Sequence, residues 1–138
     1  MADATLLQQI LVVMLGGSLG AAARFIIGAQ VASWKWYEFP WGTLFVNLVG
    51  CFLMGVLYVA SQKEMPQLLK VGIGIGFLGS LTTFSTFGLD VLLIWKRGHA
   101  DLALLYLLAS LGFGISLVAA GITVGQWWLG AINQPMST

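Results

Sequence analysis

The sequence predicts an all-α membrane protein in which four helices cross the bilayer and the third helix is broken mid-span. Hydrophobic residues make up 59% of the 138 residues and charged residues only 8%, whereas a soluble domain carries about 25% charged residues. The mean hydropathy is +0.93. Long apolar segments account for nearly the whole chain, and one of them contains a run of glycine, serine and threonine that can interrupt a helix.

The four predicted spans cover residues 6–31, 43–60, 68–95 and 102–128. A membrane helix needs about 20 residues, so the second segment is close to this minimum and the others leave room for tilt or for a break. The first segment is expected to be a span rather than a cleaved signal, because it lacks a basic region and its apolar run is too long. We expect residues 1–138 to form one four-span domain.

Glycine pairs spaced four residues apart are expected to bring the spans together. They occur in the first, third and fourth segments, at Gly16 and Gly20, Gly72 and Gly76, and Gly121 and Gly125. Such pairs let two helix backbones approach closely in lipid. The pairs therefore predict where the spans pack, and they carry no information on chemistry.

The positive charges hardly indicate an orientation in the membrane. Four spans place both chain ends on one side, together with Lys63 and Lys70, and the opposite side receives Lys35, Lys96 and Arg97. An excess of Lys and Arg normally sets the orientation, and two against three is almost no excess. Two outcomes stay open: one fixed orientation, or dual topology, in which copies insert both ways and assemble antiparallel. Four helices cannot easily enclose a pore, so an oligomer is expected either way.

The third segment contains the most informative run, Gly-Ile-Gly-Phe-Leu-Gly-Ser-Leu-Thr-Thr-Phe-Ser-Thr-Phe, from Gly74 to Phe87. A helix in lipid must satisfy every backbone N–H and C=O group internally. Glycine loosens the backbone, and serine and threonine hydroxyls can bond to backbone carbonyls and bend the helix. Those hydroxyls belong to Thr82, Thr83, Ser85 and Thr86. Interrupted helices at membrane depth are tolerated where they line a cavity or an ion site, so the run points to passage of an ion or a solute.

Polar residues in the second and fourth spans have two interpretations each. Thr43 and Asn47 are four residues apart and share a helix face. The Asn47 amide needs partners in the membrane, so it either bonds to a neighbouring helix or donates its N–H₂ group to an anion in a pore. Tyr106 and Ser110 are likewise four residues apart, and they form either a structural hydroxyl pair or a polar track.

Aromatic and charged residues in the spans are also ambiguous. Phe84 and Phe87 share a face and could simply pack, although their electropositive ring edges could contact a small anion beside Ser85. Arg24 and Asp90 are expected at similar depth, and charges in spans usually pair or line aqueous paths. They could form an ion pair, or Arg24 could attract anions in a vestibule.

Enzymatic interpretations are weak. The run Gly-Gly-Ser-Leu-Gly from Gly16 to Gly20 matches the nucleophile-elbow pattern, but that pattern needs a strand–turn–helix context. The sequence shows no metal-binding Cys/His cluster, paired carboxylates or phosphate loop. We therefore expect no enzyme, and the net charge of +1 gives no reason to expect a nucleic-acid partner.

Two stretches closely resemble the Fluc (CrcB) family of fluoride channels. They are Gly-Thr-Leu-Phe-Val-Asn-Leu from Gly42 to Leu48, and Gly-Phe-Leu-Gly-Ser-Leu-Thr-Thr-Phe-Ser-Thr-Phe from Gly76 to Phe87. The run Gly-Gly-Ser-Leu-Gly-Ala-Ala-Ala-Arg that ends at Arg24 also fits, as does the Tyr106 and Ser110 pair. The resemblance covers all four spans. Ser80, Gly88 and Asp90 depart from residues that are common in the family.

The resemblance implies a passive fluoride-selective channel, a multi-pass protein of the inner (plasma) membrane that exports cytoplasmic fluoride and confers fluoride resistance. It implies an antiparallel dual-topology homodimer with two pores. Asn47, Phe84 and Phe87 would contact fluoride. The other pore residues would be Thr43, Ser85, Thr86, Tyr106 and Ser110, with Arg24 as a vestibule or structural charge. The backbone carbonyls of Gly79 and Thr82 from both subunits would hold one structural sodium ion.

The main alternative is a small dual-topology, proton-coupled multidrug transporter, which also has four spans and nearly balanced charges. Such exchange needs a membrane-buried acid as the proton carrier. The first span offers only Arg24, and the candidate acid Asp90 is predicted near an interface. A non-transporting assembly protein is a third possibility, and the cluster of hydroxyl and phenylalanine residues argues against it.

Overall fold

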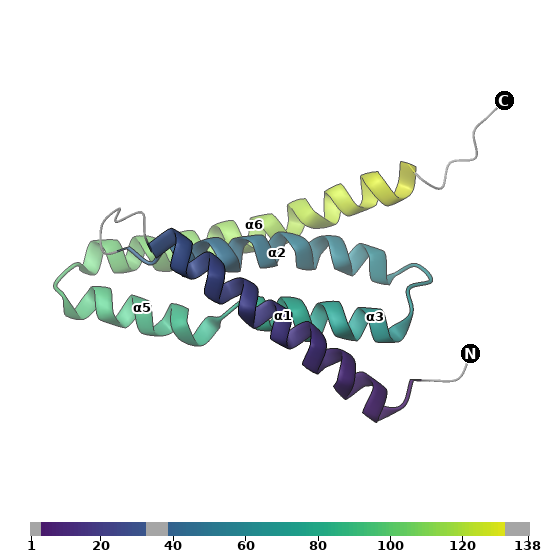
Figure 1. Cartoon of the computed structure of the whole chain (residues 1–138). Helices are drawn as coiled ribbons and strands as arrows, with labels where there is room; N and C mark the ends of the chain where they lie inside the picture. The colour runs from purple at the N-terminus through teal and green to yellow at the C-terminus, as the bar shows by residue number, and fades with distance from the viewer. Residues whose placement is uncertain (1–3, 33–38, 132–138) are drawn as a thin grey trace.

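The computed structural model describes residues 4–32 and 39–131, and within these ranges the chain is helical, with no strand (Figure 1). The helical elements are α1 (Leu6–Ala32), α2 (Trp41–Ser61), α3 (Gln67–Val71), η1 (Gly72–Leu78), α4 (Gly79–Leu81), α5 (Phe84–Lys96) and α6 (Ala100–Ala131). The η1 element is a π-helix. Lys35, one of the charges counted above, lies outside the described residues.

In this part of the chain, four helical stretches are long and apolar enough to cross a membrane. They cover Leu6–Val31, Trp41–Ser61, Gln67–Lys96 and Ala100–Leu129. The third stretch is assembled from α3, η1, α4 and α5. The predicted all-α membrane fold with four spans is therefore confirmed.

The helices form a bundle in which α2 contacts α1, α6 and the third span. In Figure 1, α2 and α6 run side by side, and α1 crosses the third span obliquely. The α5 element packs against α6, and both α4 and α5 contact α2. The point where α4 ends and α5 begins is consequently held next to α2.

Glycine residues let the backbones of neighbouring helices approach closely in the bundle. A Cβ atom on Gly16 would clash with the Gly72 carbonyl oxygen, which joins α1 to η1. A Cβ atom on Gly121 would clash with the Phe52 carbonyl oxygen, which joins α6 to α2. These contacts confirm that the i, i+4 glycine pairs mark packing surfaces, as small residues do in membrane helices. Gly55 on α2 makes the same kind of contact.

The third span is not helical at Thr82 and Thr83, which lie between α4 and α5. Thr82 has φ −84° and ψ 155°, and Thr83 has φ −149° and ψ 113°, so both residues are extended. The π-helix η1 ends at Leu78 and is separated from these residues only by the short α4 element, and π-helical turns often occur at functional sites. The chain therefore changes its backbone conformation several times within one span.

Two small apolar clusters lie before and after the extended residues. Leu78 and Leu81 pack with Val46 of α2 on one side. Phe87 packs with Tyr106 of α6 on the other side, in a cluster that also holds Ile94 and Ala103. Thr82 and Thr83 thus lie between two packed regions, which fixes the position of the candidate site.

Candidate ion-binding site at the third span

The side-chain amide of Asn47 makes two hydrogen bonds to the backbone of Thr83, one through its oxygen and one through its nitrogen. The Thr83 N–H donates to Asn47 Oδ1 at 2.8 Å, and Asn47 Nδ2 donates to the Thr83 carbonyl oxygen at 3.1 Å. The interhelical bond considered for Asn47 is therefore present. The amide has a second N–H on Nδ2, so a contact between Asn47 and fluoride stays a prediction.

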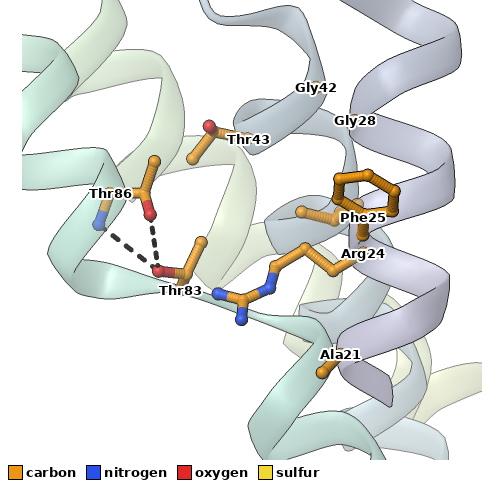
Figure 2. A pocket seen from close by; sticks show the side chains of 9 residues that line it. Ala21, Arg24, Phe25, Gly28, Gly42, Thr43, Thr83 and Thr86 are labelled. Carbon is orange, nitrogen blue, oxygen red and sulfur yellow. Dashed lines mark hydrogen bonds between the residues drawn. The ribbon is translucent and has the colours of Figure 1, made fainter. Parts of the chain in front are cut away.

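Thr83 also caps α5. Its Oγ1 accepts a hydrogen bond from the Thr86 N–H at 3.3 Å and donates to Thr86 Oγ1 at 3.1 Å (Figure 2). Ser85 Oγ lies 3.3 Å from the same Thr83 Oγ1 atom. Threonine is a preferred residue at this position because its hydroxyl satisfies one of the free N–H groups at a helix start. Three hydroxyls are thus gathered at the N-terminus of α5.

Two backbone carbonyls at the interruption lose their usual helical donors. In a continuous α-helix, the Gly79 carbonyl would accept from the Thr83 N–H and the Thr82 carbonyl from the Thr86 N–H. Here the Thr83 N–H is bonded to Asn47 Oδ1 and the Thr86 N–H to Thr83 Oγ1. Gly79 and Thr82 are the two residues whose carbonyls were predicted to hold sodium.

A cavity of about 310 Å³ lies between α2, α5 and α6. Its lining includes four of the predicted pore residues: Asn47, Phe84, Phe87 and Ser110. Cys51 and Thr83 also line it, and neither was among the predicted pore residues.

The two phenylalanines of the predicted pore lie in different surroundings. Their ring centroids are 5.7 Å apart with an interplanar angle of 46°. The Phe84 side chain is 81% exposed on the subunit, whereas Phe87 is only 6% exposed. Phe87 also packs against the Tyr106 ring at a centroid distance of 5.2 Å. Phe84 is therefore free to contact an ion or a second subunit, and Phe87 is fixed by its neighbours.

A second cavity, of about 360 Å³, lies between α1, α2 and α5, and three further predicted residues, Arg24, Thr43 and Thr86, line it. Thr83 also lines it, and the Arg24 side chain extends towards Thr83 in Figure 2. Predicted pore residues thus line two different cavities, and Thr83 lines both.

Several polar side chains next to the cavities are buried in the bundle. Tyr106 is fully buried, and Thr43 lies near both the Asp90 carboxyl and the Tyr106 hydroxyl. Within the described part of the chain, Asp90 Oδ2, Tyr106 Oη and Ser110 Oγ are buried without a hydrogen-bond partner. Arg24 and Asp90 form no ion pair there, so the structure does not support the pairing that was one of two interpretations.

Sequence reasoning did not identify Thr83 as the central residue of the site. Thr83 bonds to α2, caps α5 and lines both cavities. The available signal was the position of a threonine directly before an apolar helical segment, which is typical of a helix N-cap. Ser80, which departs from the family pattern, lies on α4 with its Oγ facing Gly17 of α1.

Comparison with known proteins gives the same family as the sequence motifs. A family model described as CrcB-like protein, Camphor Resistance (CrcB), matches residues 11–122. A protein of Magnetococcus marinus named fluoride-specific ion channel FluC is 44% identical over 121 residues, which cover 86% of this chain and 98% of the relative. Proteins of the same name from Xanthomonas euvesicatoria and Nitrobacter winogradskyi are 40% and 37% identical, over 87% and 83% of this chain and 92% and 93% of each relative.

These relatives are named as channels, not enzymes. The family model spans parts of all four membrane helices, including the whole interruption between α4 and α5. The chain therefore belongs to the CrcB family, whose curated relatives are named fluoride-specific ion channels.

Proposed function

We propose that this protein is a passive fluoride-selective channel of the inner (plasma) membrane that exports cytoplasmic fluoride as an antiparallel homodimer. The observation that carries the proposal is the interruption of the third span, where Asn47, hydroxyl groups and two phenylalanines surround the start of α5. The names of the relatives support fluoride as the ion.

The start of α5 has the chemistry that an anion needs. The first N–H groups of a helix have no partner within the helix, and the helix dipole makes this end positive. Helix N-termini are accordingly common anion sites. Fluoride must exchange its hydration shell for donors, and here the free N–H of Asn47, the hydroxyls of Thr86 and Ser85, and the ring edge of Phe84 are close to this helix end.

The end of α4 has the opposite character and fits a cation. The last carbonyls of a helix are partly negative, and the helical donors of Gly79 and Thr82 are bonded elsewhere. Sodium is a hard cation that prefers oxygen ligands. Two antiparallel subunits that meet here would bring these two carbonyls from each copy, with the ion acting as a structural link that does not permeate.

The surface of the subunit is consistent with a partner at the interruption. Phe84 is 81% exposed, and Gly79 on the other side of the interruption is also exposed. The nearly balanced Lys and Arg counts permit insertion in both directions. An antiparallel copy would cover these residues and complete the walls of the cavities.

Dual topology predicts that each connecting loop is reached from both sides of the membrane. Cys51 would be replaced by Ser, and a single reporter cysteine would be placed at Glu64 or at His99, which are exposed in the connectors at opposite ends of the bundle. Each reporter should react with a membrane-impermeant thiol reagent from both faces of the cell membrane. Labelling of each reporter from one face only would contradict antiparallel assembly.

Passive export needs only the membrane potential. A negative interior drives an anion outward by about 2.3 kcal/mol per charge per 100 mV, so neither ATP nor a coupled ion is required. Fluoride-loaded liposomes should empty only when a potassium shunt balances the charge, and they should do so without a pH gradient. Efflux that requires a proton gradient would instead favour the proton-coupled transporter.

A further inference from the structure

We propose that Asn47 is a positioning residue that keeps the third span interrupted, and that it thereby controls access of a cation to the Gly79 carbonyl. This role is distinct from direct contact with fluoride. The second half of the proposal rests on the sodium site proposed above, whereas the first half rests on the hydrogen bonds of the subunit alone.

The two hydrogen bonds between Asn47 and Thr83 join one side-chain amide to both backbone groups of a single residue. At 2.8 Å and 3.1 Å, they engage the N–H and the C=O of Thr83 with the acceptor and donor ends of the same amide. A neighbouring strand pairs with an extended residue in the same way, through both of its backbone groups. Asparagine can do this because its short planar amide carries a donor and an acceptor side by side.

The location of Thr83 makes this pairing necessary. Thr83 is extended and only 8% exposed, in the middle of a stretch that is long and apolar enough to span a membrane. Backbone groups without partners are strongly unfavourable in the bilayer, so an unpaired extended residue would tend to return to a continuous helix. Asn47 removes this tendency by satisfying both groups.

The Thr83 N–H has two competing acceptors, and only one leaves the cation site intact. In a continuous helix it would bond to the Gly79 carbonyl oxygen. In the structure it bonds to Asn47 Oδ1. While Asn47 holds this N–H, the Gly79 carbonyl can turn towards a cation. Loss of the Asn47 amide would free the Thr83 N–H to compete with a cation for the Gly79 carbonyl, and cation binding would weaken.

A second feature of α2 supports the same role. Gly50 lies three residues after Asn47, on the same side of the helix, and a Cβ atom at Gly50 would clash with Thr82 Cγ2. The second span therefore contacts the interruption in two ways: Asn47 bonds to the backbone of Thr83, and the missing side chain of Gly50 leaves room for Thr82. The Thr82 side chain fills that space, and its Oγ1 bonds to the Leu78 carbonyl oxygen at 3.0 Å.

The test compares three variants of the full-length protein in lipid nanodiscs. N47L keeps the approximate size of the side chain and removes both hydrogen bonds. N47D keeps an acceptor for the Thr83 N–H. It should fold even if N47L proves too unstable to fold. S110A is the matched control, because Ser110 lines the same cavity and makes no hydrogen bond to Thr83. The readouts are amide hydrogen exchange at Thr83 and the sodium concentration at the midpoint of thermal stabilisation.

In N47L the Thr83 N–H loses its bond to Asn47 Oδ1 and bonds to the Gly79 carbonyl only part of the time, so we expect its exchange to be at least about tenfold faster than in the wild type. N47D and S110A should retain wild-type protection. The sodium midpoint should rise by about tenfold in N47L and stay unchanged in S110A, even where S110A lowers fluoride flux. Wild-type exchange and a wild-type sodium midpoint in N47L would overturn the proposal and leave Asn47 as a fluoride ligand only. If sodium does not stabilise the wild type, the proposed sodium site is wrong. Exchange at Thr83 then decides by itself whether Asn47 keeps the third span interrupted.

Discussion

Replacing Phe84 with isoleucine should lower fluoride flux at least about tenfold, which corresponds to roughly 1.4 kcal/mol in the barrier. Isoleucine keeps an apolar side chain and removes the electropositive ring edge that a small anion can contact. Because the Phe84 side chain is 81% exposed on the subunit, its substitution removes little packing within the subunit. Flux would be measured in liposomes at matched protein content, with dimer formation checked by gel filtration.

The control for this prediction is Phe113→Ile. Phe113 is 62% exposed on α6 and lines neither of the two cavities described above. It should retain wild-type flux. Phe87→Ile should also lose flux, but Phe87 is 6% exposed and packs on Tyr106, so its loss combines a missing ring edge with altered packing. Wild-type flux in both the Phe84 and the Phe87 variants would contradict a role of the ring edges in fluoride passage.

Replacing Gly121 with alanine should destabilise the subunit by about 1–3 kcal/mol, the usual range for overpacking. A Cβ atom there would clash with the Phe52 carbonyl oxygen, and a backbone atom cannot move aside as a flexible side chain can. The α2 and α6 helices would have to separate, which would also widen the cavity of about 310 Å³ between them. Thermal unfolding in detergent would give the change in stability.

Gly112→Ala provides the matched control for Gly121, since it lies on the same helix and a Cβ atom there would meet nothing within 4 Å. Alanine has a higher helix propensity than glycine by about 1 kcal/mol, so this variant should be as stable as the wild type or more stable. Equal destabilisation of the two variants would show that the backbone contact between α2 and α6 is unimportant.

The sequence was sufficient for those features that depend on a single helix. Composition and segment length predicted four spans, and the spacing of Gly16 and Gly20 predicted a close helix contact. The high cost of an unpaired amide in lipid predicted that Asn47 needs a partner, and an interhelical bond was one of the two partners considered. Each of these inferences uses local spacing or solvation, which does not require knowledge of the neighbouring helix.

The features that the sequence did not predict depend on how helices rotate against one another. The i, i+3 spacing placed Phe84 and Phe87 on one face, but α5 begins at Phe84, and only Phe87 packs within the cluster around Tyr106. The sequence also did not indicate that the predicted pore residues line two separate cavities, with Thr43 and Thr86 in one and Asn47 and Ser110 in the other. The π-helix η1 adds to this difficulty, because its wider turns change which residues face α1 and α2.

The most direct test of the central claim is to compare fluoride and chloride efflux from the same proteoliposomes under a potassium shunt. If the hydroxyl and amide donors around the start of α5 bind fluoride as proposed, fluoride should leave rapidly while chloride efflux stays at the rate of protein-free liposomes. The rate should not depend on a pH gradient. Equal efflux of chloride and fluoride, or fluoride efflux that requires protons, would contradict the assignment of this protein as a passive fluoride-selective channel.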